Sequence, residues 1–266
     1  MQIRHLAMAM AAAVLAVGCV GVNSSAKKGA LVLSFDDRNF AGWERAIPLF
    51  EKYGAHATFF VSGKIDDAAV ATMRKLRAHG HTVGIHGLRH ANAPKDGDAA
   101  AREKWFAADI EPQLAACRAA GLAVVNYAYP NCRRSDETDA LLFAKGLSRI
   151  RGGSGLTPHD PKNEKAHLRK PLAPNDAAFV PGADIPKTRL MKGCIMGRNY
   201  HTNIDEYIAC LRRAAARGEM FQIISHDIAP EPNGISMRTE WLEKLLATAN
   251  ELGLPVLSYD ELPRSW

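Results

Sequence analysis

The sequence contains few cysteines, no cysteine pair with metal-binding spacing and no long hydrophobic segment. Five of its 266 residues are cysteine and none belongs to a CxxC motif, which argues against a zinc site built from cysteine pairs. The longest apolar run, Leu6 to Val17, is too short to be a permanent membrane-spanning helix. Lysine and arginine are scattered through a chain of formal net charge +6, so no basic block indicates nucleic-acid binding.

The composition does contain enough apolar material for a folded core. Hydrophobic residues make up 47% of the chain and charged residues 23%, values typical of a soluble globular protein. The length suits a single α/β barrel. No internal repeat or low-complexity linker follows Lys28, and we therefore expect one domain over residues 30–266.

The N-terminus resembles an export signal. Arg4 precedes the apolar run, and small residues then lead to Cys19. We expect residues 1–18 to be a signal peptide, in the manner of a lipoprotein signal, and residues 19–29 to be a short tether. Because Ala16 stands where such signals usually carry leucine, ordinary cleavage near Ala26 is the alternative. The protein is then exported and is periplasmic, secreted or anchored to a membrane only through lipid on Cys19.

The four remaining cysteines leave their redox state open. Cys117, Cys132, Cys194 and Cys210 allow three pairings in an exported protein. Isolated buried thiols are the equally acceptable alternative.

From Ala30 onward, short apolar runs alternate with segments of helical periodicity. This alternation predicts a mostly parallel sheet with helices outside it, closed as a distorted (β/α) barrel of about seven parallel strands. Residues 151–192 are rich in proline, glycine and charge, and we expect a long loop there. The predicted strands are 30–35, 56–61, 81–85, 122–129, 220–225 and 255–258, and the predicted helices are 43–53, 66–79, 99–120, 136–145, 203–217 and 237–252.

Reactive side chains follow several predicted strands, at the edge where α/β enzymes build their active sites. Asp36 and Asp37 end the first strand, and they must lie on a bend to act together because neighbours in a strand point to opposite faces. His86 and His90 follow the third strand and can converge on one metal ion, leaving coordination positions open for catalysis. Taken singly, an aspartate that caps a helix or a solvated histidine pair is the simpler interpretation.

Two further segments end late strands. The stretch Tyr129-Pro130-Asn131 forms a stiff turn whose backbone N–H groups could face an oxyanion. His226 follows an apolar strand, and its near-neutral pKa would suit a general acid.

The order and spacing of these segments resemble the polysaccharide deacetylase family of metal-dependent carbohydrate esterases. The resemblance runs from about Ala30 to the C-terminus, with a gap in the middle, and includes the segments ATFFV at 57–61 and GHTVGIH at 80–86. It implies a distorted (β/α) barrel, one divalent metal ion such as zinc, and an acetylated polysaccharide or oligosaccharide as substrate.

The resemblance also implies a role for each motif residue. Asp36 matches the catalytic base and His226 the general acid, while Asp37, His86 and His90 match the metal ligands. The substrate-binding residues would be Tyr129, Pro130, Asn131 and Ile224, where Asn131 occupies the position of the oxyanion-stabilising N–H and Ile224 lines the acetyl pocket.

Three departures mark a divergent member. Arg38 replaces the glycine that normally follows the two aspartates, and Ala128 replaces the arginine that normally orients the base. Arg38, Arg133, Arg134 or Arg151 could supply the missing guanidinium. No motif with an aspartate that tunes the catalytic histidine is evident, and Asp176 and Asp184 are the candidates.

The expected activity is hydrolysis of the acetyl amide of an N-acetylated glycan, with O-acetyl ester hydrolysis as a close variant, since the same metal-water chemistry serves both. A metal-dependent amidase acting on a small molecule and a non-catalytic glycan-binding lipoprotein are the alternatives. Retention of Asp36 and His226, which glycan binding alone does not require, argues against the binding protein.

Overall fold

The computed structural model describes residues 29–94, 98–154, 174–197, 202–231 and 233–266. The expected signal peptide, Cys19 and most of the tether lie outside these residues. Within the described ranges, every helix is too short or too polar to span a bilayer.

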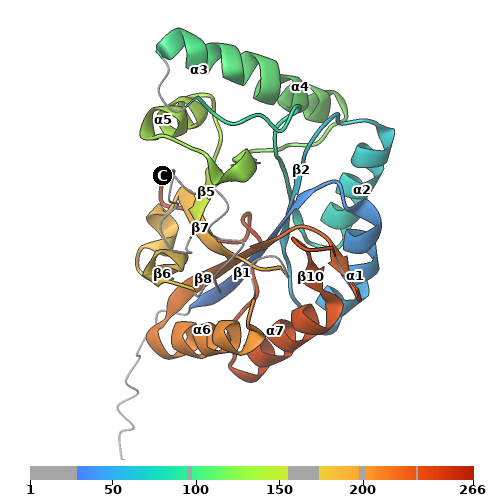
Figure 1. Ribbon diagram of the computed structural model, residues 1–266, viewed down its shortest axis with the longest axis vertical. Coiled ribbons are helices and arrows are strands. Elements are labelled where there is room, and N and C mark those ends of the chain that lie inside the picture. The colour runs from blue at the N-terminus through green and yellow to red at the C-terminus, as the bar shows by residue number, and fades with distance from the viewer. Residues whose placement is uncertain (1–28, 95–97, 155–173, 198–201, 232) are drawn as a thin grey trace, which may run out of the picture.

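Seven parallel strands form a closed ring, with the helices around its outside (Figure 1). The ring closes because β1 pairs with β2 on one side and with β8 on the other. This confirms the predicted barrel. The ring strands are β1 (Ala30–Asp37), β2 (Thr58–Val61), β3 (Thr82–Ile85), β4 (Asn126–Ala128), β5 (Arg149–Ser154), β7 (Leu190–Ile195) and β8 (Glu219–Ser225).

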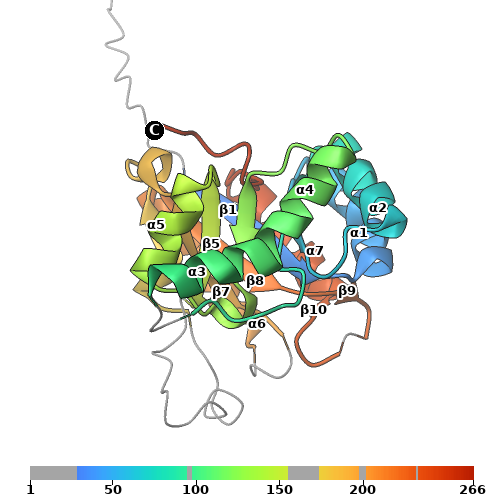
Figure 2. The same cartoon turned by 90° about the horizontal axis from the view of Figure 1, so that it is seen from above.

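The helices cover the outer face of the ring and are visible along its sides in Figure 2. They are α1 (Phe40–Lys52), α2 (Asp67–Ala78), α3 (Ala99–Trp105), α4 (Glu111–Ala119), α5 (Asp136–Ala144), α6 (Ile204–Arg217) and α7 (Thr239–Glu251). Their ends follow local chemistry: the Asp66 side chain accepts the Ala69 N–H at the start of α2, and Gly218 ends α6 with φ of 65°. The predicted helix 99–120 is interrupted by the π-helical turn Phe106–Ile110.

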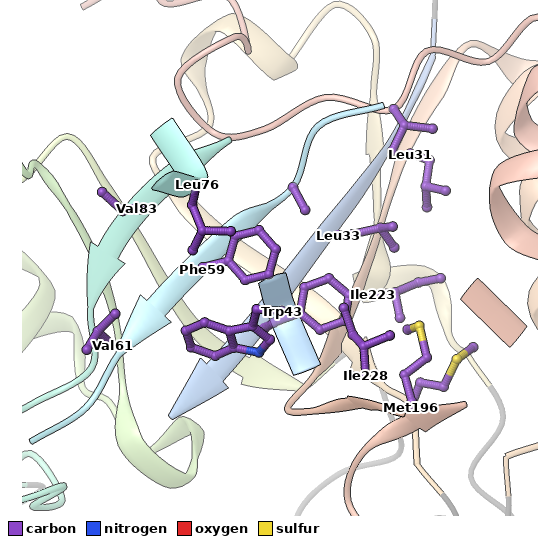
Figure 3. Close-up of a cluster of buried hydrophobic side chains, with 14 of the residues drawn as sticks. Leu31, Leu33, Trp43, Phe59, Val61, Leu76, Val83, Met196, Ile223 and Ile228 are labelled. Carbon is purple, nitrogen blue, oxygen red and sulfur yellow. The ribbon is translucent and has the colours of Figure 1, made fainter. Parts of the chain in front are cut away.

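Successive side chains of β1 point alternately to the outer face and to the lumen of the barrel, and each face belongs to a separate apolar cluster. Leu33 points outward and packs with Trp43 of α1 and Phe59 of β2 (Figure 3). Phe35 belongs to the same outer cluster. The opposite face of the ring strands lines the barrel lumen, which holds a second cluster that includes Val32, Phe60, Ala128 and Tyr259. Asp36 shares the lumen face of β1, so the barrel interior directs its carboxylate.

The predicted loop over residues 151–192 is wrong at both ends. Those ends are ring strands β5 and β7, which pair with each other in parallel. Strand β5 could not be predicted from an apolar run, because its lumen-facing residues are two fully buried arginines, Arg149 and Arg151. A short strand, β6 (Phe179–Pro181), lies antiparallel to β8.

The predicted last strand, residues 255–258, is not a ring strand. It makes a single bridge, from Val256 to Leu31, at the amino-terminal end of the barrel. The chain that follows closes this end of the lumen, where Arg149 donates to the carbonyl oxygens of Tyr259 and Pro263, both at 2.6 Å. The functional side chains lie at the opposite end of the barrel, where the ring strands have their carboxyl ends.

Candidate active site

The carboxyl ends of β1, β3 and β8 bring together five of the residues singled out in the sequence. His90 Nε2 lies 3.7 Å from Asp37 Oδ1, and His226 Nε2 lies 4.0 Å from Asp37 Oδ2. His86 Nε2 lies 3.8 Å from Asp36 Oδ2. Two carboxylates and three imidazoles therefore share one site.

A left-handed backbone at Asp37 allows the two adjacent carboxylates to act together. Its φ of 82° is the bend that the sequence required after a straight strand. Among the described residues, the other non-glycine residues of positive φ are His90, Asn131 and Cys132, all in loops that surround this site. Such strain, concentrated at one place, is typical of functional sites.

Asp37, His86 and His90 form a donor set that fits one metal ion. Their candidate ligand atoms all lie within 4.8 Å of one another. His86 Nδ1 lies 2.8 Å from the carbonyl oxygen of Ala128, which leaves Nε2 for a metal. Burial lowers the pKa of His86 to about 4, so its imidazole is neutral at neutral pH, as a ligand must be. Two imidazoles and one carboxylate are the donors of an open zinc site.

Asp109 supports the loop between the two histidines, and the sequence analysis missed it. It is fully buried in the π-helical turn, where its Oδ1 accepts the backbone N–H of Arg89 at 2.6 Å. Its backbone carbonyl accepts the N–H of Leu88 at 2.8 Å. A Cβ on Gly87 would lie 2.6 Å from its Oδ2, so glycine is required there. The sequence signal that could have identified Asp109 is a charged residue on the face of a predicted helix that is otherwise apolar.

Asp36 is held by Arg151, which resolves the choice among the candidate arginines. Arg151 Nη2 donates to Asp36 Oδ2 at 2.6 Å, and both side chains are buried. Burial by itself would raise the pKa of Asp36. The positive charge of Arg151, which also donates a hydrogen bond to Asp36, is the main influence that opposes burial, and this pKa lies below its usual value.

Two of the other candidate arginines have different partners. Arg38 donates to the carboxylate of Asp66, at 2.8 Å for the shorter contact, and therefore turns away from the site. Arg134 Nε donates to Asp139 at 2.7 Å.

His226 has a backbone partner in place of a carboxylate. Its Nδ1 lies 3.0 Å from the carbonyl oxygen of Ile235, and its own carbonyl accepts the indole N–H of Trp43 at 2.8 Å. The candidates Asp176 and Asp184 lie elsewhere: Asp176 pairs with Arg213 of α6, and the Asp184 carbonyl accepts the hydroxyl of Thr188.

Of the four residues expected to bind substrate, one points away from the site and three lie nearer to it. The Tyr129 side chain belongs to the outer core, where it stacks on Trp105 and its hydroxyl donates to Asp139 at 2.8 Å, so it does not reach the site. Tyr129 faces outward because alternation places Ala128, its neighbour in the chain, on the lumen side.

Pro130, Asn131 and Ile224 are placed nearer the site. Pro130 Cγ lies 3.5 Å from the Cβ position of Gly87, in the loop that carries His86 and His90. Asn131 is exposed, and its amide donates to Asn92 at 2.9 Å. Ile224 is buried near the end of β8, two residues before His226.

Comparison with known proteins gives a family match and several structural likenesses. A family profile described as polysaccharide deacetylase matches residues 23–149, which include Asp36, Asp37, His86 and His90. A search of curated protein sequences finds no match.

Similar folds occur in several solved structures. A family 4 acetyl xylan esterase from Clostridium thermocellum, in complex with a cobalt ion, is 18% identical with a TM-score of 0.51, over 87% of this chain and 89% of that one. A peptidoglycan deacetylase from Bacillus subtilis is 15% identical with a TM-score of 0.51, over 88% and 89% of the two chains. A family 4 carbohydrate esterase from Streptomyces lividans, in complex with acetate, is 14% identical with a TM-score of 0.53, over 85% and 91%.

These likenesses show a shared fold. The profile match, the order of the motifs along the chain and the closed seven-stranded barrel agree with one another. The departures at Arg38 and Ala128 and the displaced arginine set the chain apart within that group. Residues 23–149 therefore resemble the polysaccharide deacetylase family, with motifs that diverge from its usual pattern.

Proposed function

We propose that the protein is a metal-dependent hydrolase that removes acetyl groups from an N-acetylated polysaccharide. One observation carries the proposal: a buried carboxylate, Asp36, and an imidazole, His226, flank the donor set of Asp37, His86 and His90. A group that takes a proton and a group that gives one then stand beside the same candidate metal site, as acyl hydrolysis requires.

Asp37, His86 and His90 would hold the metal ion, for which we propose zinc because of its affinity for imidazole and carboxylate ligands. When bound, a zinc ion polarises the acetyl carbonyl and lowers the pKa of a water ligand. His90 is exposed and His86 is buried, so the donor set lies at the surface end of the lumen, where a substrate can reach it.

Asp36 is the proposed general base. Its Oδ2 is occupied by Arg151, whereas its buried Oδ1 has no hydrogen-bond partner among the described protein groups and is free to accept a proton from water. Because Arg151 lowers its pKa, Asp36 is ionised at neutral pH and ready to act as a base. Each such proton transfer is worth roughly 10²–10⁴-fold in rate.

His226 is the proposed general acid, which protonates the leaving group. Cleavage of an amide depends on this step more than cleavage of an ester does, because an amine leaves poorly without a proton. The presence of His226 at the site therefore favours N-acetyl substrates, and O-acetyl esters form the secondary class. Ile224 and the turn Pro130-Asn131 are the proposed contacts of the acetyl group and the oxyanion.

We also propose that the protein is exported and acts on envelope or extracellular glycan. The apolar run before Cys19 supports export. A polymeric substrate outside the cytoplasm is consistent with the bacterial relatives, whose descriptions name xylan and peptidoglycan.

The test is acetate release from chitin oligomers, peptidoglycan fragments and acetylated xylan, with zinc and after chelation. Asp36→Asn would be compared with wild type, and Asp205→Asn, an exposed residue paired with Lys244 on the outer surface, is the matched control. We expect zinc-dependent release that Asp36→Asn abolishes and Asp205→Asn retains. Stoichiometric zinc binding without release from any glycan would contradict the proposal.

A further inference from the structure

We propose that Ser236 and Asn233 are positioning residues which, through the backbone carbonyl of Ile235, fix His226 in one tautomer and turn its Nε2 toward the active site. The inference rests on the proposed function in that His226 is taken as the proton donor. It assigns a task to the segment 233–237, which lies outside the residues matched by the family profile.

The partner of His226 determines its tautomer. A carbonyl oxygen only accepts hydrogen bonds, so Nδ1, at 3.0 Å from the Ile235 oxygen, must carry the proton. Nε2 is then the nitrogen that exchanges a proton with the reaction, and it is the nitrogen on the side of Asp37, 4.0 Å from Oδ2. The two ring nitrogens thus have separate tasks.

Asn233 and Ser236 hold the Ile235 peptide in place. Asn233 Oδ1 accepts the hydroxyl of Ser236 at 2.6 Å and the N–H of Ile235 at 3.3 Å. The N–H of Ser236 in turn donates to the carbonyl of Asn233 at 3.2 Å. This closed turn sets the direction of the Ile235 carbonyl.

Ser236 also connects this turn to the histidine itself. Its Oγ, which is fully buried, accepts the N–H of Asp227, the residue after His226, at 3.2 Å. The N–H of Met237 donates to the carbonyl of Asp227 at 2.9 Å. One hydroxyl therefore links the backbone of Asp227, the residue next to the histidine, to the turn that orients the histidine ring.

The turn at 233–237 packs closely against the chain that follows β7. A Cβ on Gly197, just beyond β7, would lie 2.8 Å from the carbonyl carbon of Ile235. From the other side, Trp43 Nε1 donates to the His226 carbonyl at 2.8 Å. The imidazole is thus held by its backbone, by its Nδ1 and by close packing behind the turn.

The direct test is ¹⁵N–¹³C NMR of the histidine rings in the zinc-loaded protein at about pH 8, where an unperturbed imidazole is neutral. The His226 signal is identified by its loss in His226→Gln. We expect the Nδ1–H tautomer in wild type and in Asn233→Asp, which keeps the acceptor oxygen. We expect a mixture of tautomers in Ser236→Ala and Asn233→Ala.

Kinetics provides the second readout. We expect Ser236→Ala to lower kcat by about 10- to 100-fold while KM and zinc affinity stay unchanged, because a misplaced proton donor affects the transition state and not substrate binding. Ser258→Ala is the matched control. It also removes one buried hydroxyl, which donates to Glu261 at the closed end of the barrel, and should retain wild-type kcat.

An Nε2–H tautomer in wild type would overturn the inference, as would an unchanged tautomer in both Ser236→Ala and Asn233→Ala. These outcomes do not depend on catalysis. A wild-type protein that shows the Nδ1–H tautomer but releases no acetate would contradict the proposed function and leave the positioning role standing.

Discussion

Arg151 and Ala128 are directly paired across β4 and β5, and both face the barrel lumen. In the family that the sequence resembles, the position of Ala128 carries the arginine that orients the catalytic base. Here the guanidinium comes from the neighbouring strand at the same level of the barrel and donates to Asp36 at 2.6 Å. A guanidinium therefore pairs with Asp36 although the residue that precedes Tyr129 is an alanine.

Replacing Arg151 should move the pH profile of the enzyme. Arg151→Met removes the charge that lowers the pKa of Asp36, and burial, which raises this pKa, then dominates. The base would stay protonated to a higher pH, so the acidic limb of kcat/KM against pH should shift upward, with a loss of activity of about 10²-fold at neutral pH. The measurement is the rate of acetate release across the pH range.

Because an unpaired buried carboxylate costs about 3–5 kcal/mol, folding of this variant must be checked by circular dichroism. A relocation variant makes the test independent of folding losses. Ala128→Arg combined with Arg151→Ala should recover a large part of the activity lost in Arg151→Ala alone. An identical pH profile in wild type and Arg151→Met would refute the role of Arg151.

Removing the Asp109 carboxylate should weaken metal binding. In Asp109→Ala the N–H of Arg89 loses its acceptor, and the loop that carries His86 and His90 loses its buried support. Groups that support metal ligands indirectly typically account for 10- to 100-fold in affinity, and we expect a loss of about tenfold in zinc affinity. A competition titration against a zinc-binding dye measures it.

Asp98→Ala is the control for a general effect on helix stability. Asp98 caps α3 by accepting the N–H of Ala101 at 2.8 Å, and its loss should cost about 1 kcal/mol of stability without changing zinc affinity. Equal zinc affinities in wild type and Asp109→Ala would show that the loop does not depend on Asp109.

A side chain at Gly42 should displace the segment that carries His226. A Cβ there would overlap Asp227 Oδ1 and lie 2.9 Å from the carbonyl oxygen of Ile228. Gly42→Ala must therefore push residues 226–228 away from α1, at a cost of about 1–3 kcal/mol in stability and with a lower kcat. Urea unfolding and acetate release measure the two effects.

Gly54→Ala, at the other end of α1, is the control that separates a loss of stability from a loss of kcat. Its backbone has a φ of +57°, which disfavours alanine, but its Cβ would meet no atom within 4 Å. We expect a stability loss of about 1–2 kcal/mol and unchanged kcat. A Gly42→Ala protein with wild-type kcat would mean that the His226 segment does not depend on its contact with α1.

The protein should lose stability in mild acid because of His81. This histidine immediately precedes β3, packs edge-on against Phe50 and Phe59, and accepts the N–H of Ala57 at 3.1 Å. Burial, with smaller contributions from His56 and His79, lowers its pKa to about 3. The folded protein then keeps His81 neutral while the unfolded chain binds a proton below about pH 6.5.

The contribution of His81 is therefore complete above about pH 6.5 and falls by roughly 1.4 kcal/mol per pH unit between about pH 6.5 and pH 3. Urea unfolding at several pH values measures this slope. His81→Gln, which retains an acceptor for the Ala57 N–H, should be less stable at neutral pH but show a shallower decline in acid. Equal slopes for the two proteins would exclude His81 as the source.

The sequence predicted the parts of this protein whose signals are local. Asp36, Asp37, His86 and His226 each follow an apolar strand, and parallel strands of a barrel bring such positions to one end. The barrel itself was predictable because apolar runs of strand length alternate with helical periodicity.

Tertiary structure decided the rest, because the signals involved are not local. Strand β5 was missed since burial in the lumen is satisfied there by charge pairing and carbonyl acceptors instead of apolar side chains. Four arginines were equal candidates, and the hydrogen bond from Arg151 to Asp36 identified the one that pairs with this carboxylate. The partner of His226 is a peptide carbonyl, which every residue carries, so only the folded turn at 233–237 could place it against that imidazole.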